Sequence, residues 1–141
     1  MLGCIDVGGP GYGHGMRGFA LVGPRGERWQ VDEATTRRER VRGLRGRSPG
    51  KHQAMLFERC RSVHTIGMRF PITVAFLDAS WRVVRVERTP AGRILFCRRA
   101  RHVLECHVGA DVQVGDALSR DVPPAGVGWR VLVHHHRAKI R

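Results

Sequence analysis

The sequence has 141 residues, is 42% hydrophobic and carries a formal net charge of +13 at pH 7. Its length and hydrophobic content suit one domain with a core of its own. No run approaches the ~18 consecutive apolar residues of a membrane-spanning helix, and the N-terminus lacks the basic and apolar segments of a secretory signal. We therefore expect a cytoplasmic protein without a transmembrane segment.

The positive charge has two interpretations. It can attract nucleic acid or another polyanion, but 23 arginines against 2 lysines, with no asparagine, are also typical of a GC-rich genome. Codon bias does not explain why Asp and Glu together number only 12. The arginines do not alternate with aromatic residues, as a stacking platform for single strands requires. An anionic ligand or partner is therefore our main hypothesis, and weak nonspecific binding of nucleic acid is an alternative.

The two ends of the chain differ in composition from its middle. Residues 1–18 are rich in glycine, but neither a proper strand nor a helix flanks them, so we expect a flexible leader and not a phosphate-binding loop. Residues 19–120 contain the apolar segments of a folded domain. Residues 121–141 include His134–His136 and form a basic C-terminal extension.

Short apolar runs separated by turn residues predict strands along the domain. Phe19–Val22 and Arg28–Val31 flank a Gly-Pro-Arg-Gly turn and predict a hairpin. Thr36-Arg37-Arg38-Glu39 has the pattern of a capping box, which predicts a helix that runs to about Leu44. Further strands are expected at Ala54–Phe57, Ile94–Cys97, His102–Val108 and Trp129–Val133. A strand with a tight Gly-Asp turn is expected at Val112–Leu118.

The segment Ile72–Leu77 has one polar residue, Thr73, and follows a proline at its entrance, so it predicts a buried strand. Asp78–Trp81 forms a turn, after which Arg82–Arg88 returns as the second strand of a hairpin. Many short strands and one helix together predict a mainly β (α+β), single-domain, β-barrel-like fold with the helix near its N-terminal side.

Several pieces of the sequence occur in a familiar order. They are R-V-R-G-L-R-G-R at residues 40–47, M-L-F at 55–57, S-V-H-T-I-G-M-R-F-P-I-T-V-A-F-L-D at 62–78, R-V-V-R-V at 82–86, A-R-H-V-L-E at 100–105 and V-G-D-A-L at 114–118. In this order they resemble the domain of unknown function 192 family over residues 19–120. The resemblance implies a compact, mainly β domain with a helix near its start, and it implies no reaction.

The chain departs from the pattern of that family at three single positions and in the stretch between Glu105 and Val114, which is shorter than usual. Thr73 stands where family members usually have an acidic residue, so a site that depends on this carboxylate would be weakened or absent. Trp81 stands near the place of a turn glycine, which predicts a strained or differently built turn. Arg45 adds a charge where other members are apolar.

The four cysteines, Cys4, Cys60, Cys97 and Cys106, form no C-x-x-C pair, and in a cytosolic chain we expect four free thiols. Cys60 lies between two arginines that would lower the pKa of its thiol, four residues before His64. An enzyme that uses this Cys–His pair is a second alternative function.

A metal site would need several converging ligands. On the predicted strand 102–108, His102 and Cys106 face one side and Glu105 faces the other. Two ligands on one side are too few for a metal, so we predict no metal and no cofactor. The remaining candidates, His52, His64 and His107, have no predicted partners.

The residues before the buried strand form the candidate ligand-binding loop. His64 can exchange a proton or donate a hydrogen bond, Thr65 can donate another, and Arg69 can bind a carboxylate or phosphate. The alternative is that His64 and Thr65 only satisfy backbone groups at the strand entrance. We predict that the loop, together with Arg42 and Arg47 of the expected helix, binds an anionic small molecule or partner. The predicted function is non-enzymatic, that of a binding or accessory protein.

Overall fold

The structure, a computed structural model, describes residues 18–34 and 49–121. These residues form nine β-strands and no helix. The strands are β1 (Gly18–Val22), β2 (Arg28–Glu33), β3 (Gln53–Glu58), β4 (Ser62–His64), β5 (Ile72–Leu77), β6 (Val83–Thr89), β7 (Ile94–Phe96), β8 (His102–His107) and β9 (Ser119–Asp121). The mainly β prediction is confirmed.

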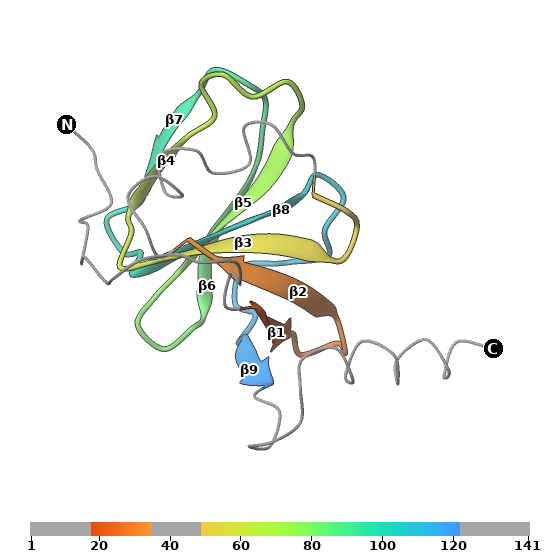
Figure 1. Cartoon of the computed structure of the whole chain (residues 1–141). Helices are drawn as coiled ribbons and strands as arrows, with labels where there is room; N and C mark the ends of the chain where they lie inside the picture. The colour runs from red at the N-terminus through yellow and green to blue at the C-terminus, as the bar shows by residue number, and fades with distance from the viewer. Residues whose placement is uncertain (1–17, 35–48, 122–141) are drawn as a thin grey trace, which may run out of the picture.

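Seven strands form one twisted sheet in the order β6-β5-β8-β3-β2-β1-β9, and β4 and β7 form a separate two-stranded ribbon. The ribbon lies at the opposite end of the molecule from β9 (Figure 1). All neighbours are antiparallel except β2 and β3, which pair in parallel from Gln30↔Gln53 to Glu33↔Leu56. The β1–β2 and β5–β6 hairpins were both predicted from their turn residues and are confirmed.

Strand β5 is fully buried along its length, as its apolar sequence predicts. It pairs with β6 on one side and with β8 on the other. Its hydroxyl-bearing member, Thr73, is 2% exposed and donates a hydrogen bond from Oγ1 to the carbonyl of Val108 at 2.9 Å. A buried polar group is thereby satisfied where the family usually has a carboxylate.

The sheet buries both of its faces, and β8 shows this by alternation. Leu104 and Cys106 belong to a core cluster on one face with Leu56, Ala75 and Leu77. Val103 belongs to the cluster on the other face. Glu105, two residues after Val103 on β8, lies between Met55 of β3 and Val74 of β5, which both belong to this second cluster. Glu105 therefore lies on the opposite side from Cys106, as predicted.

The sheet is not closed into a barrel, which corrects that part of the predicted fold. Strands β6 and β9 remain its two edges. Between them runs an irregular segment: Val83 donates to the carbonyl of Asp116, Gly115 donates to that of Val83, and Leu118 donates to that of Trp81. These bonds join the start of β6 to the segment that precedes β9. That segment forms only a single bridge, Arg82↔Ala117, so the two edges are not connected by a ladder of paired residues.

Two further predictions fail or fall outside the described residues. Of the strand with a tight Gly-Asp turn predicted at Val112–Leu118, the turn is present and the strand is wrong, because Gly115 has a φ of 95° and the Asp116 carboxylate accepts from the backbone N–H of Gln113. Both features turn the chain. The predicted helix at 36–44 and the predicted strand Trp129–Val133 lie outside the described residues.

The turn between β5 and β6 is strained, as the tryptophan in a glycine's place predicts. Trp81 has a φ of 63°, a left-handed conformation that non-glycine residues rarely adopt. The Asp78 carboxylate supports the turn by accepting from the N–H groups of Ser80 and Arg82 at 2.8 and 3.0 Å.

A matched pair of variants measures this strain. Trp81→Ala and Trp81→Gly both lose the indole, but only alanine keeps the left-handed penalty. We therefore expect the glycine variant to be more stable than the alanine variant by about 1 kcal/mol, as measured by urea unfolding. Equal stabilities would mean that the turn relaxes and stores no strain at this position.

Candidate anion-binding site

Five exposed arginines gather on two adjoining loops. We call Arg59, Arg61, Arg98, Arg99 and Arg101 the arginine cluster. The first two follow β3, and the other three lie between β7 and β8. The high charge of these two segments is visible in the sequence, but their proximity is not.

Hydrogen bonds fix the two loops to each other. The N–H of Cys60 donates to the carbonyl of Arg101 at 2.9 Å, and the N–H of Cys97 donates to that of Arg61 at 2.9 Å. The guanidinium Nε of Arg61 donates to the carbonyl of Ala100 at 3.1 Å. Because the backbone is held at several points, the charges are brought together before any ligand arrives, and preorganisation lowers the entropic cost of binding.

His102, at the start of β8, lies beneath this cluster. Its Nδ1 accepts from the backbone N–H of Arg59 at 3.3 Å, and its ring stacks on that of Trp81 with centroids 4.5 Å apart. The two residues that hold it, Arg59 and Trp81, are the two described non-glycine residues with left-handed φ. Burial, more than the surrounding arginines, lowers the pKa of His102. This histidine is therefore neutral at pH 7 and supports the loop without adding to its charge.

The arginine cluster has no ion-pair partner among the described residues. The carboxylates near the sheet are already engaged: Glu58 pairs with Arg120, Glu87 with Arg85, and Asp121 with Arg28. Exposed like charges repel one another, and an anion that binds between them relieves this repulsion. The cluster thus has the positive charge that an anion-binding site needs, and its backbone is held in place by hydrogen bonds.

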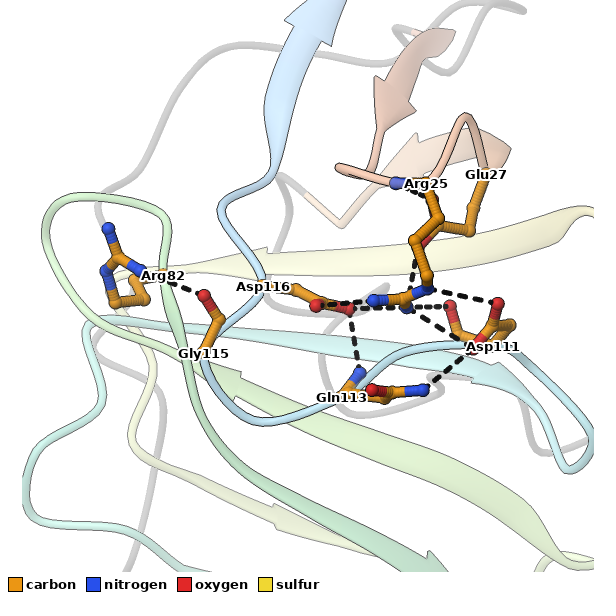
Figure 2. Close-up of polar contacts among 7 residues, drawn as sticks. All are labelled: Arg25, Glu27, Arg82, Asp111, Gln113, Gly115 and Asp116. Carbon is orange, nitrogen blue, oxygen red and sulfur yellow. Dashed lines mark hydrogen bonds and ion pairs between the residues drawn. The ribbon is translucent and has the colours of Figure 1, made fainter.

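Arg25 shows how a saturated arginine differs. It lies in the β1–β2 turn and reaches across to Asp116, to which Nη1 and Nη2 donate at 2.8 Å each (Figure 2). It also pairs with Glu27 at 2.7 Å and with Asp111 at 3.3 Å. The hydrogen bonding between Arg25 and Asp116 lowers the pKa of Asp116 and raises the pKa of Arg25. Three carboxylates neutralise this arginine, so it joins two loops and offers no charge to a ligand.

The structure places the predicted loop residues at the far end of the ribbon from the cluster. His64 is exposed and lies opposite Ile94 of β7, and Arg69 is exposed. Thr65 is fully buried: its Oγ1 donates to the carbonyl of Pro90 at 2.7 Å and accepts from the N–H of Arg93 at 2.9 Å. The hydroxyl of Thr65 therefore already has both a donor and an acceptor within the protein. Arg42 and Arg47 lie outside the described residues.

The expectation of four free thiols is wrong. Cys60 is fully buried and disulfide-bonded, whereas Cys97 and Cys106 are free. A disulfide sulfur is not a thiolate nucleophile, so this state of Cys60 contradicts the alternative of an enzyme that uses Cys60 with His64. The charge of Arg59 and Arg61, which suggested that chemistry, instead forms part of the cluster.

One buried carboxyl was not singled out as a functional residue. Glu105 is 3% exposed, and its Oε2 has no hydrogen-bond partner among the described residues. Burial raises the pKa of Glu105 to about 8. Burial, and in second place the charge of Glu105, raises the pKa of the neighbouring Cys106 thiol. The A-R-H-V-L-E piece located this glutamate in the sequence, but its burial depends on strands β3 and β5, which lie on either side of it.

The described residues form neither a metal-ion cluster nor a membrane-spanning helix. Among residues 18–34 and 49–121, no three His, Cys, Asp or Glu side chains come together in a way that could hold a metal ion. The same residues contain no helix long and apolar enough to cross a membrane.

Comparison with solved structures confirms the fold. A protein from Sinorhizobium meliloti 1021, described as a candidate transcription regulator, is 20% identical with a TM-score of 0.63 over 73% of this chain and 92% of its own. A protein of unknown function from Novosphingobium aromaticivorans DSM 12444 is 18% identical with a TM-score of 0.59 over 81% of this chain and 94% of its own. At these identities the likeness concerns the fold alone. None of the curated proteins matches the chain.

The family is established by a match to residues 20–119, which cover most of the chain and all six of the sequence pieces. The matching family is described as an uncharacterized conserved group, DUF192. The chain therefore belongs to the domain of unknown function 192 family.

Proposed function

We propose that this domain is a binding protein for an anionic ligand or partner and that the arginine cluster is its main contact. The observation that carries the proposal is the group of five exposed arginines, on two hydrogen-bonded loops, without an ion-pair partner among the described residues. Guanidinium groups bind phosphate and carboxylate through paired hydrogen bonds.

The residues predicted from the sequence, His64, Thr65, Arg69, Arg42 and Arg47, stay a prediction as a second part of this binding face. Within it, the buried Thr65 would hold the loop through its two internal hydrogen bonds and would not contact the ligand. His64 lies three residues along the chain from Arg61, which is about 10 Å at the rise of a β-strand. A single phosphate cannot span that distance. An extended polyanion or a charged surface can contact both parts, and this favours such a ligand over a small monovalent anion.

Thermal unfolding tests the proposal. Inositol hexakisphosphate, a soluble polyanion, should raise the Tm of the full chain more than sodium chloride at equal ionic strength. The double variant Arg98→Gln/Arg99→Gln should weaken its binding at least about tenfold, because each charge-assisted hydrogen bond contributes about 1.5–3 kcal/mol.

The control removes the same charge elsewhere. Lys51 and Arg88 are exposed and lie outside the cluster, so Lys51→Gln/Arg88→Gln should keep nearly the wild-type affinity. Equal losses in both double variants would show that only net charge matters, and a Tm unmoved by the polyanion would remove the proposal. A steep salt dependence of binding to duplex DNA, stronger than that for the polyanion, would favour nucleic acid instead.

A further inference from the structure

The β4–β7 ribbon exposes an apolar outer face. Leu95 and Cys97 pack against the core cluster beneath the ribbon. Because side chains alternate along a strand, Ile94 and Phe96 point the other way. They are 60% and 48% exposed, among the most exposed large apolar side chains described. His64 of β4, also exposed, lies opposite Ile94.

Arginines flank this apolar pair at both ends. Arg93 directly precedes β7, and Arg98 and Arg99 directly follow Cys97. Arg61 lies on the neighbouring segment, where its backbone carbonyl accepts a hydrogen bond from the N–H of Cys97. All four are exposed and lack an ion pair among the described residues. The face therefore combines bulky apolar side chains with a surplus of positive charge.

The strand that carries the pair is held in place. The Nη1 of Arg85 donates to the carbonyl of Phe96 at 2.8 Å, and Arg85 is itself paired with Glu87. At the other end, the Thr65 hydroxyl accepts from the N–H of Arg93. The one carboxylate close to β7 on β6 is thus neutralised, so it does not offset the flanking arginines.

We propose that the outer face of the β4–β7 ribbon docks the domain on an anionic lipid surface. Ile94 and Phe96 enter the headgroup region, while Arg61, Arg93, Arg98 and Arg99 contact lipid phosphates. This inference rests on the proposed anion binding by the arginine cluster and names its partner. Apolar insertion and basic charge together give stable attachment where either signal alone is weak.

The chemistry of the face favours lipid over the other polyanions. Ile94 is the more exposed member of the pair, and an aliphatic side chain cannot stack on a nucleobase, as single-strand binding requires. A protein interface needs about 20–30 residues on each side, whereas the apolar patch here consists of two side chains, Ile94 and Phe96, on one three-residue strand. Insertion into a headgroup layer needs only a few bulky side chains.

Sedimentation with vesicles tests the inference on the full chain. The wild-type protein should bind vesicles of equimolar phosphatidylglycerol and phosphatidylcholine and not vesicles of phosphatidylcholine alone. Ile94→Ser/Phe96→Ser should weaken binding to the anionic vesicles about tenfold or more, while it keeps the Tm response to inositol hexakisphosphate. Arg98→Gln/Arg99→Gln should weaken both responses about tenfold or more.

Val114→Ser is the matched control, because Val114 is 65% exposed and lies in the loop beside the start of β6, outside the ribbon. It should bind vesicles like the wild type. If the wild type responds to the soluble polyanion but ignores anionic vesicles, the lipid inference fails and the proposed function stands. If the Ile94/Phe96 variant binds vesicles unchanged, apolar docking is wrong. If neither vesicles nor polyanion bind, both proposals fail.

Discussion

Replacing Glu105 with methionine should stabilise the protein by about 3 kcal/mol at pH 7. The carboxyl is fully buried, and its pKa is raised from 4.5 to about 8 by burial. Folding at pH 7 must therefore protonate a group that is ionised in the unfolded chain, at about 1.4 kcal/mol for each pH unit above 4.5. Methionine has a similar length and carries no charge.

The pH dependence of that gain identifies its cause. Below pH 4.5 the carboxyl is protonated in both states, so ionisation costs no stability. Between pH 4.5 and 8 the unfolded chain releases the proton while the folded chain keeps it, so wild-type stability falls as pH rises. Urea unfolding should show a gap between variant and wild type that widens from about pH 5 to pH 8.

The half-exposed, ion-paired Glu87 provides the control. Glu87→Gln should leave the wild-type pH profile in place, since its carboxylate is not buried in the core. A Glu105→Met variant whose advantage is the same at every pH would show that its effect comes from packing and not from ionisation.

Thr65→Val should destabilise the protein by about 2–3 kcal/mol. Valine has nearly the same shape, but it cannot donate to the carbonyl of Pro90 or accept from the N–H of Arg93. Each buried or half-buried partner left without a hydrogen bond costs about 1–3 kcal/mol. The expected consequence is a loosened connection between the ribbon and the loop after β6, measured by urea unfolding.

Thr65→Ser separates this role from a role in ligand binding. Serine keeps the hydroxyl and loses one methyl group, so its cost should be about 1 kcal/mol or less. At a temperature where all variants are folded, Thr65→Val should bind inositol hexakisphosphate nearly as well as the wild type. A valine variant that is stable but has lost its affinity would place Thr65 in the binding face, as the sequence analysis predicted.

Elements with a strong apolar pattern were predictable from the sequence, and elements without one were not. Ile72–Leu77 is buried on both faces, and its composition says so directly. The three-residue strands β4 and β9 contain Ser62, His64, Ser119, Arg120 and Asp121, residues whose polarity gives no strand signal. They become strands because β7 pairs with β4 and β1 pairs with β9. Such pairing depends on the tertiary structure and not on the local sequence.

The site divides in a similar way. Runs of arginine are visible in the sequence, and so is the loop from His64 to Arg69. That Arg61 and Ala100 meet follows from the antiparallel register Ser62↔Phe96, which no local pattern specifies. The burial of Cys60 was also unpredictable, because its two arginine neighbours suggested an exposed position.

The position of β9 in the sheet has a consequence for how the chain acquires its structure during synthesis. Leu21 of β1 pairs with Arg120 of β9, and Arg25 and Arg28 pair with Asp116 and Asp121. The β1–β2 hairpin therefore lacks its neighbour β9 until the ribosome has translated nearly all of the domain. Such late, long-range pairing slows folding and leaves the β1 edge open to other nascent chains until β9 arrives.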